Sequence, residues 1–377
     1  MVASPDTLNS LANFSMLAPL WSDSRWRLLD TGLLPAAPNL ALNQALLDSH
    51  EAGESPHTLR FLRFQPSALL GFHQSAEQEL QLDACARAGI TVQRRITGGG
   101  AIYFDPSHLG WELYLHRRLL PHADMAQVAR QLCELAAQGI STLGVAAQFR
   151  PRNDIEVAGR KISGTGGAFS GPSLMYQGTL LLDMDVERMV SVLRIPAEKL
   201  RDKAIASARE RVTSLRQLLG VIPPLEQVQQ ALATAFAEGL GIELIPAGLN
   251  DAEQARYQQV LAEMDTPKWV YQQQRPLAEA PLRQATHRVT GGLIHASVAL
   301  DIRQQRLKQV WLTGDFFVYP PRRIWDLEAA LKDLLLSELA QRVETFFQQN
   351  PTDMVLLTPA DLVMAIQLAC NFELPSL

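Results

Sequence analysis

Two arginines lead directly into three glycines in the stretch RRITGGGAIYFD, residues 94–105. A glycine run lets several backbone N–H groups converge on one point without side chains in the way, and such nests bind anions, phosphate above all. The planar guanidinium groups of Arg94 and Arg95 also suit phosphate or carboxylate. No Gly-Lys-Ser/Thr follows, and the spacing is not that of a dinucleotide-binding fingerprint, so neither motif is present. The simpler interpretation is a flexible turn with solvated arginines.

A second group of polar residues lies in RNDIEVAGRKISGTGG, residues 152–167. The pattern predicts a hairpin that turns at the Ala-Gly pair. Asn153 and Asp154 then begin one strand, and Lys161 begins the next. A lysine held over a phosphate and a carbonyl oxygen would stabilise the charge that develops in acyl transfer, and a nearby aspartate could hold Mg2+ together with phosphate oxygens. Taken alone, the segment also fits a surface hairpin with a solvated lysine.

A third signal is YQGTLLLD, residues 176–183, in which the small Gly178 precedes a continuous apolar run. The run predicts a buried strand. Such a strand could line the site of an apolar ligand. Core packing alone also explains the apolar run.

These residues need elements that position them, and the sequence predicts such elements throughout the chain. We expect a strand, a turn and a helix over 26–50 with Asn39 as N-cap; two strands over 59–74; a helix ending at Gly89; a strand, a glycine turn and a strand over 91–105; a strand over 109–120; a long helix closed by Gly139; basic helices over about 185–240; paired strands over 293–302 and 306–319; and a helix over 325–347.

The length of 377 residues favours two domains. We expect a leader over 1–25, a larger domain over 26–248 and an accessory C-terminal domain over 249–377, because the pattern restarts after a Pro/Gly-containing connection near residue 250. The net charge of −5 argues against a nucleic-acid partner, since such proteins usually show a basic excess.

The three cysteines, Cys85, Cys133 and Cys370, lie far apart in the sequence. Their odd number and spacing predict neither a disulfide framework nor a zinc site, and a reducing cytoplasm fits them best. No basic region followed by an apolar one opens the chain, so no signal peptide is expected. No long apolar stretch predicts a membrane span. We therefore expect a cytoplasmic protein without a membrane partner.

The blocks RRITGGGAIYFD, RNDIEVAGRKISG, QGTLLLD and RERVTSL occur in an order that resembles the lipoate-protein ligase A family, within the biotin/lipoate ligase and octanoyltransferase superfamily. The resemblance spans roughly residues 26–220. It continues more weakly into the tail, where PKWVY and TGDFF are similar to the accessory domain of the longer ligases. It implies an α/β (α+β) fold with a class II synthetase/biotin-ligase-like mixed sheet flanked by helices, plus a smaller C-terminal α/β domain.

Enzymes of this family activate lipoate with ATP to lipoyl-adenylate, release pyrophosphate and pass the lipoyl group to a lysine of a carrier domain. The resemblance therefore implies a lipoate–protein ligase that uses ATP and Mg2+, with lipoate as substrate and the apo form of a lipoyl-domain carrier protein as partner.

The resemblance also implies roles for single residues. Lys161 is expected to be catalytic, because it matches the lysine that contacts both the acyl carbonyl and the phosphate, and Asp154 is the expected Mg2+ ligand. The residues expected to bind ATP or the adenylate are Arg95, Gly100, Ala101, Ile102, Tyr103, Asn153, Asp154 and Lys161. Those expected to bind lipoate are Thr97, Gly98, Gly99, Lys161 and Gly178, with Leu70, Leu180 and Leu182 along the lipoyl tail.

The sequence departs from the family pattern at three places. Phe104 stands where many relatives carry histidine, and its phenyl ring cannot donate a polar contact. SGTGGAF replaces the commoner small-Ala-Gln pattern after the lysine, and Asn43-Gln44 replaces a frequent Asp-Glu pair.

Other functions stay open at this point. An octanoyl or lipoyl transferase between carriers would need no ATP, but related transferases carry the acyl group on a cysteine. The neighbourhood VAAQFRPRND, where one such branch has that cysteine, contains none. A non-catalytic lipoyl-binding homologue would have no reason to keep Arg95, the glycines and Lys161 together. A biotin ligase has a different glycine turn.

Overall fold

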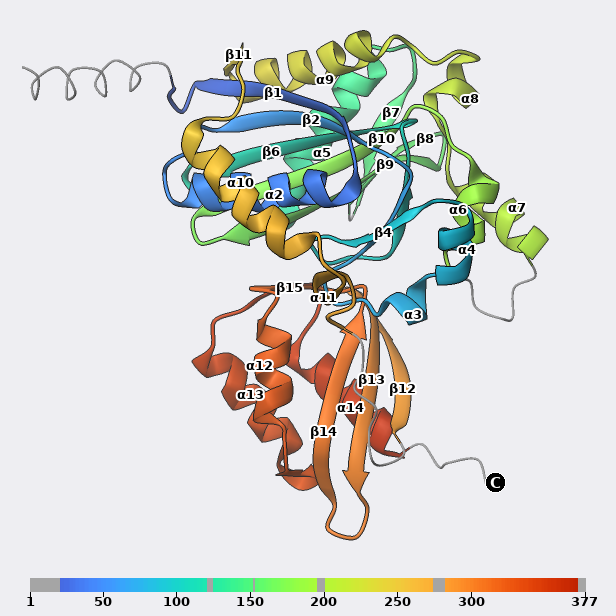
Figure 1. Ribbon diagram of the computed structural model, residues 1–377, viewed down its shortest axis with the longest axis vertical. Coiled ribbons are helices and arrows are strands. Elements are labelled where there is room, and N and C mark those ends of the chain that lie inside the picture. The colour runs from blue at the N-terminus through green and yellow to red at the C-terminus, as the bar shows by residue number, and fades with distance from the viewer. Residues whose placement is uncertain (1–20, 121–124, 152, 195–200, 274–281, 372–377) are drawn as a thin grey trace, which may run out of the picture.

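The computed structural model describes residues 21–120, 125–151, 153–194, 201–273 and 282–371. Most of the leader expected over 1–25 lies outside these residues. The chain forms a larger and a smaller unit, each built on its own sheet (Figure 1). The expected mixed sheet flanked by helices, with a smaller C-terminal α/β unit, is confirmed.

The larger unit contains an eight-stranded mixed sheet with the strand order β11-β1-β2-β6-β10-β9-β8-β7. Strands β11, β1 and β2 are parallel, and the other neighbours pair antiparallel. The strands are β1 (Arg25–Leu34), β2 (Thr58–Phe64), β6 (His108–His116), β7 (Ala147–Arg150), β8 (Asp154–Val157), β9 (Arg160–Ser170), β10 (Ser173–Leu181) and β11 (Glu243–Pro246).

Helices cover both faces of this sheet, with α2 and α10 in front and α5 behind it (Figure 1). The alternation of strand residues explains this, because buried side chains point to both faces. The helices of the larger unit are α2 (Ala36–Glu51), α3 (Ala76–Glu79), α4 (Leu82–Arg87), α5 (Met125–Ser141), α6 (Val186–Val192), α7 (Arg201–Arg211), α8 (Leu215–Leu219), α9 (Leu225–Leu240), α10 (Asp251–Met264) and α11 (Pro267–Val270), with a 3-10 turn at Arg117–Leu119.

Two local predictions in these helices are wrong. Gly139 does not close α5, which continues to Ser141. A Cβ atom on Gly139 would lie 2.8 Å from the carbonyl oxygen of Ala231, so the glycine lets α9 approach. Asn39 is not an N-cap but lies inside α2, where its side chain accepts a hydrogen bond from Arg60 at 2.7 Å. In both cases long-range packing decides the role of the residue.

The glycine turn lies in a separate small sheet with the strand order β4-β3-β5. These strands are β3 (Ser67–Leu70), β4 (Thr91–Arg94) and β5 (Ile102–Phe104). The expected strand, turn and strand over 91–105 is thus confirmed, with residues 95–101 forming the connection.

The smaller unit has a four-stranded sheet with the order β12-β13-β14-β16 and a two-stranded sheet of β15 and β17. Its elements are β12 (Arg283–Val289), β13 (Gly292–Asp301), β14 (Arg306–Gly314), β15 (Phe317–Tyr319), α12 (Arg323–Ala330), β16 (Leu334–Leu335), a 3-10 turn at Leu336–Glu338, α13 (Leu339–Gln349), β17 (Asp353–Val355) and α14 (Pro359–Asn371). The single helix predicted over 325–347 is therefore wrong: the short strand β16 interrupts it, because it pairs with β14.

Helix α10 packs with the larger unit, although the sequence placed the boundary near residue 248. Arg27 of β1 and Glu253 of α10 form an ion pair at 2.6 Å, and each side chain is only 1% exposed. Tyr257, Val260 and Leu261 join the apolar cluster beneath α2. We place the division between the units after α11, since α10 buries its polar and apolar groups against the larger sheet.

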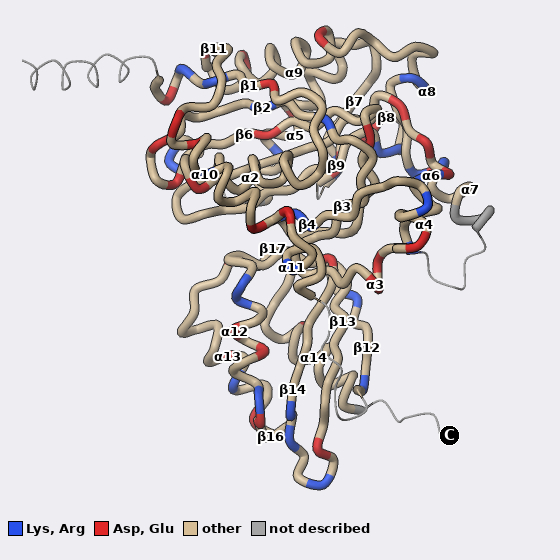
Figure 2. The backbone as a smooth tube through the Cα atoms, viewed as in Figure 1, with Lys and Arg blue, Asp and Glu red and all other residues tan. Residues whose placement is uncertain are grey.

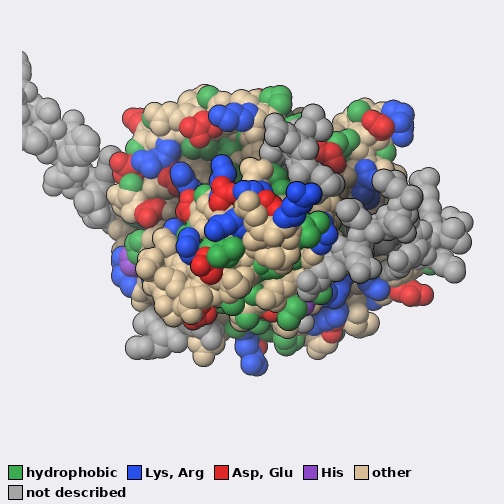
Figure 3. All heavy atoms as spheres, turned by 90° about the horizontal axis from the view of Figure 1, so that it is seen from below, with side chains coloured by type: hydrophobic (Ala, Val, Ile, Leu, Met, Phe, Trp, Pro, Cys, Tyr) green, Lys and Arg blue, Asp and Glu red, His purple; other side chains and the backbone are tan. Residues whose placement is uncertain are grey.

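Charged residues are spread over the helices, strands and loops of both units (Figure 2). Seen from the end of the smaller unit, positive and negative side chains are interspersed (Figure 3). None of the helices within the described ranges combines the length and apolarity that crossing a bilayer requires.

Candidate active site

The hairpin of β8 and β9 turns at Ala158 and Gly159, which both have positive φ angles, of 50° and 77°. This is the two-residue turn that the sequence predicts. The side-chain amide of Asn153 donates to the carbonyl oxygen of Thr165 at 2.8 Å, and the Thr165 N–H donates back to the Asn153 carbonyl at 2.8 Å. Asn153 therefore fixes the open end of the hairpin.

Lys161 and Asp154 come together on this hairpin. The Lys161 ammonium lies 2.6 Å from a carboxylate oxygen of Asp154, and both side chains are partly exposed, at 38% and 25%. Asp154 pairs with Gly164 across the strands. A Cβ atom on Gly164 would lie 2.7 Å from Lys161 Nζ, so the lysine folds over a position without a side chain.

Arg95 is buried and is surrounded by main-chain carbonyl groups. Its guanidinium donates to the carbonyl oxygens of Leu69 at 3.1 Å, Gly98 at 2.9 Å and Gly100 at 2.8 Å. Burial lowers its pKa to about 10, which leaves it charged at neutral pH. No ion pair of Arg95 occurs among the described residues, so its positive charge is available to an anion bound at the turn.

Arg95 also sets the direction of the peptide groups in the glycine turn. In a trans peptide the C=O and the following N–H point in opposite directions. Because the carbonyls of Gly98 and Gly100 point to Arg95, the N–H groups of Gly99 and Ala101 point away from it. Within the described ranges these N–H groups have no acceptor in the protein. Arg95 therefore fixes the turn from inside and leaves these two N–H groups directed away from it, and binding of an anion by them stays a prediction.

Arg94 does not face the turn at all. It is fully buried and donates to the carbonyl oxygens of Gly71, Phe72 and Gln74 at 2.6–2.9 Å, and to that of Val270 at 2.7 Å. Arg94 thus ties α11 to the loop after β3. The solvated arginines of the simpler interpretation are not present.

The turn and Lys161 open onto the same face of the large sheet. The side-chain amide of Gln177 donates to the Thr97 hydroxyl at 3.2 Å. Two residues along β10, Thr179 pairs with Gly164, over which Lys161 folds. Residues two apart on a strand share a face and are separated by about 7 Å. Thr97 of the turn and the Lys161 ammonium therefore lie over neighbouring positions on one face of the sheet.

Other expected lipoate residues lie on the opposite face of β10. A Cβ atom on Gly178 would overlap the indole of Trp111, so this glycine makes room for a core side chain. Leu180 and Leu182 belong to the apolar cluster beneath α5, and Leu70 is buried in another cluster. The alternation of the strand turns the positions of Gly178, Leu180 and Leu182 away from Lys161, whereas Leu70 ends β3 of the small sheet.

The run expected along the nucleotide divides between two faces. Ile102 packs in the cluster beneath α2, whereas the ring of Tyr103 packs with Leu70 and Leu80. Burial raises the pKa of the Tyr103 phenol above its usual range. Phe104, which replaces the histidine of many relatives, is buried beside Phe64 with ring centroids 4.7 Å apart.

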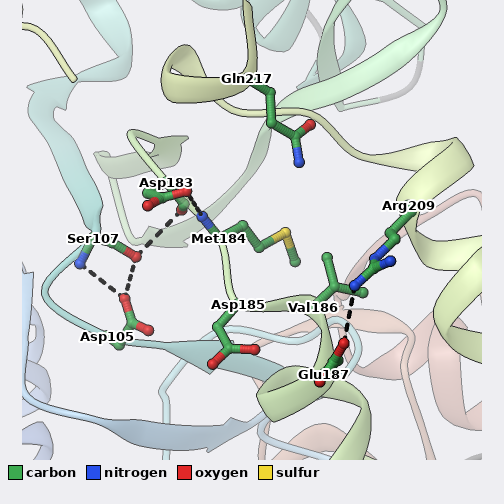
Figure 4. A pocket seen from close by; sticks show the side chains of 9 residues that line it. All are labelled: Asp105, Ser107, Asp183, Met184, Asp185, Val186, Glu187, Arg209 and Gln217. Atoms are coloured by element: carbon green, nitrogen blue, oxygen red, sulfur yellow. Dashed lines mark hydrogen bonds and ion pairs between the residues drawn. The ribbon is translucent and has the colours of Figure 1, made fainter. Parts of the chain in front are cut away.

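A cavity of about 620 Å3 lies beside this run, at the end of β10 (Figure 4). Its lining includes Asp105, Asp183, Asp185 and Glu187. Two of these carboxylates pair with arginines, Asp183 with Arg216 at 2.7 Å and Glu187 with Arg209 at 3.0 Å. The lining is therefore rich in carboxylate groups.

The expected Mg2+ site has only a partial set of protein ligands. The described residues contain no group of three or more His, Cys, Asp and Glu side chains arranged for a metal ion. Asp154 is available beside Lys161. It could hold Mg2+ only together with phosphate oxygens of the substrate, which is the usual binding mode of Mg2+ on nucleotides.

The cysteines offer no exposed thiol among the described residues. Cys85, Cys133 and Cys370 are all buried. Cys133 of α5 lies nearest the hairpin, but its thiol contacts the hydroxyl groups of Thr165 and Tyr176, both at 3.3 Å, on the α5 side of the sheet. Burial raises the pKa of this thiol, which makes it a poor nucleophile.

Gln177 was missed by sequence reasoning. A single amide within the otherwise apolar strand YQGTLLL was the signal that could have found it. Gly98 of the turn also packs against the main chain of Phe316 in the smaller unit, and this contact had no comparable signal because the two residues are more than two hundred positions apart.

A model of the family described as "Lipoyl protein ligase A/B catalytic domain" matches residues 35–237 of this chain. The octanoyltransferase LipM of Kyrpidia tusciae is 31% identical over 271 residues, which cover 65% of this chain and 98% of that protein. Subunit 1 of the lipoate-protein ligase A of Thermoplasma acidophilum is 31% identical over 227 residues, which cover 58% of this chain and 84% of that protein.

Solved structures give a similar result. The bi-partite lipoate protein ligase of Thermoplasma acidophilum matches with a TM-score of 0.60 and 27% identity, covering 68% of this chain and 99% of that chain. LipL1 of P. falciparum, solved in complex with lipoate, matches with a TM-score of 0.71 over 91% of this chain and 99% of that chain. At 15% identity the second match concerns the fold alone.

Proposed function

Because the chain belongs to the lipoyl protein ligase A/B family, we propose that it is a ligase that activates lipoate with ATP and attaches it to a lysine of a lipoyl carrier protein. An enzyme of the lipoate ligase and octanoyltransferase group follows from the family. The use of ATP, the choice of lipoate and a cytoplasmic location are the proposed part.

The observation that carries this proposal is that Lys161 and the glycine turn lie on the same face of the large sheet. None of the three cysteines exposes a thiol there. A mixed anhydride has a phosphate and an acyl carbonyl joined by one oxygen, so it needs donors on both. The outward N–H groups of Gly99 and Ala101 suit the anionic part of such a ligand. The ammonium group of Lys161, on the hairpin, is a point charge that can stabilise negative charge on both the phosphate and the carbonyl oxygen.

In the proposed reaction the carboxylate oxygen of lipoate attacks the α-phosphorus of ATP, and pyrophosphate leaves. The amine of the carrier lysine then attacks the acyl carbonyl, the C–O bond to the phosphate breaks, and AMP leaves as the amine loses its proton. Lys161 would stabilise negative charge in both steps. Arg95 would hold the nest, and Asp154 would hold both the Lys161 ammonium and Mg2+ on the phosphates.

A second candidate is transfer of an octanoyl or lipoyl group between carriers without ATP. The similarity to LipM, a protein named as an octanoyltransferase and matched over 98% of its length, favours it. The position of the three cysteines argues against a covalent cysteine route, since each is buried and Cys133 lies behind the sheet. A non-catalytic homologue is less consistent with a partly exposed Lys161.

One experiment separates these functions. The purified full-length protein is incubated with apo lipoyl carriers and either lipoate with Mg-ATP or octanoyl-carrier thioester without ATP, and carriers are weighed by intact mass spectrometry. We expect modification and pyrophosphate only in the first arm. Modification only from the thioester would replace the proposal with the transferase, and no modification in either arm would favour the binding homologue.

A further inference from the structure

We propose that Phe317, carried by the smaller unit, forms a wall of the acyl site and limits the length of the acyl chain that the enzyme accepts. The inference rests on the proposed function, because it concerns the same site.

The loop that carries Phe317 is fixed to the larger unit by three contacts. The Gly314 N–H donates to the carbonyl oxygen of His73 at 3.1 Å. The Thr313 hydroxyl donates to the side chain of Gln78 at 3.0 Å. The buried ring of Phe316 stacks on His73, with centroids 4.8 Å apart and planes 26° apart. Residues 313–317 therefore have a defined position on the larger unit.

The same loop lies directly on the glycine turn. A Cβ atom on Gly98 would overlap the carbonyl oxygen of Phe316, and one on Gly100 would lie 3.9 Å from Asp315 Cβ. The glycine at position 98 thus has a second explanation besides the anion nest, since it admits the main chain of the smaller unit. Part of the candidate site is formed only when the two units are together.

The Phe317 ring spans two glycines of the site. Its Cζ atom would lie 2.9 Å from a Cβ atom on Gly99, and its Cε1 atom 3.6 Å from one on Gly166. Gly99 belongs to the turn and Gly166 to β9, so the ring closes the space between them. Phe317 is only half-buried, unlike Phe316, and so keeps a surface for a ligand.

Lys161 and the Phe317 ring lie over neighbouring positions on one face of β9. Lys161 covers Gly164, and Phe317 covers Gly166 on the same face of β9. These positions are about 7 Å apart, which is shorter than an extended eight-carbon chain. An acyl group with its carbonyl at Lys161 therefore meets the ring before an extended eight-carbon chain ends, and the rest of a longer chain needs room beside the ring. An aromatic ring suits such a contact because it presents a large rigid apolar surface.

The test measures chain-length preference in the full-length protein. Straight-chain acids from hexanoate to dodecanoate, and lipoate, are compared by acid-dependent pyrophosphate release. We expect Phe317→Ala to raise the ratio of kcat/KM for decanoate over octanoate about 10-fold, and Phe317→Trp to lower it by a similar factor. Val318→Ala is the matched control, because Val318 is the next residue of β15 but packs in the core of the smaller unit.

A purely structural role gives a different result. Both Phe317 variants and Val318→Ala would then lower thermal stability and activity while leaving the ratio unchanged, and this outcome would overturn the inference. Acyl-carrier thioesters of the same lengths are assayed in parallel, so that the ratio is measured even if the protein is a transferase. An unchanged ratio in an active enzyme rejects the role of Phe317 alone. A wild-type protein that uses neither donor rejects the proposed function and the inference with it.

Discussion

The ammonium group of Lys161 lies over Gly164, in the space that a side chain at position 164 would occupy. The two residues belong to one strand, β9, and the absence of a side chain at one gives the other its position. The chemistry proposed for the lysine therefore depends on a glycine three residues away.

Gly164→Ala tests this dependence. The new Cβ atom would lie 2.7 Å from Lys161 Cε and Nζ, so the lysine must move while its charge stays. We expect kcat/KM for lipoate activation to fall about 10- to 100-fold, because small displacements of a catalytic group are costly. Pyrophosphate release and thermal unfolding are measured together. Gly248→Ala, which has no atom within 4 Å of the new Cβ, should leave both unchanged. Full activity of the Gly164 variant would show that the position of the lysine is unimportant.

Removal of the Lys161 ammonium should have a larger effect. We expect Lys161→Ala to lose lipoate-dependent pyrophosphate release by about 10²–10³-fold, the usual loss for one oxyanion donor. Lys161→Arg should also fail, because a planar fork replaces a point charge. Lys308→Ala removes a lysine that pairs with Asp333 in the smaller unit and serves as the control. Near-normal activity of either Lys161 variant would contradict its assignment.

Arg95→Lys separates a positioning role from phosphate binding. One ammonium cannot reach the carbonyl oxygens of Leu69, Gly98 and Gly100 that the guanidinium satisfies. We expect a loss of about 2–4 kcal/mol in the free energy of unfolding, since buried acceptors are left unpaired. Chemical denaturation measures this loss, and Arg87→Lys on an exposed position is the control. A higher KM for ATP with unchanged stability would instead mean that Arg95 acts mainly on phosphate.

Glu79 gives the stability a dependence on pH. Burial, and then the nearby Asp315, raise the pKa of Glu79 from 4.5 to about 7 in the folded protein. The folded state holds this proton more tightly than the unfolded state, so stability is full below about pH 4.5 and is lost as the pH rises to about 7. We expect Glu79→Gln to stabilise the protein at pH 8, by about 2 kcal/mol, and to have little effect at pH 4. The melting temperatures of the variant and the wild type are measured between pH 4 and 8. A difference between the two that stays constant over this range would refute the prediction. Glu238→Gln, at an exposed position, should follow the wild type.

The sequence predicted local features of the site well. The glycine turn and the Ala158-Gly159 hairpin follow from backbone requirements that act over a few residues, and both are confirmed. The contacts of Arg94 and Arg95 could not be predicted, because main-chain carbonyl groups carry no signal in the sequence. A motif that suits phosphate is equally suited to carbonyl oxygens, and only the fold decides between them.

The face of each strand residue was harder to assign. Gly178 and Leu180 lie in the predicted strand but on its core side, since the sequence alone does not say which alternate set faces the ligand. Phe317 was included only in the TGDFF block that is similar to accessory domains. Its contact with Gly99 depends on how the two units pack, which no local pattern encodes.

The ion pair between Arg27 and Glu253 determines where the polypeptide can be shortened. A fragment that stops at residue 248 would keep a guanidinium inside the protein and discard the only carboxylate that it contacts among the described residues. Truncated versions should therefore retain α10 and α11, whose Val270 accepts hydrogen bonds from Arg94, even though the sequence pattern suggests an earlier end.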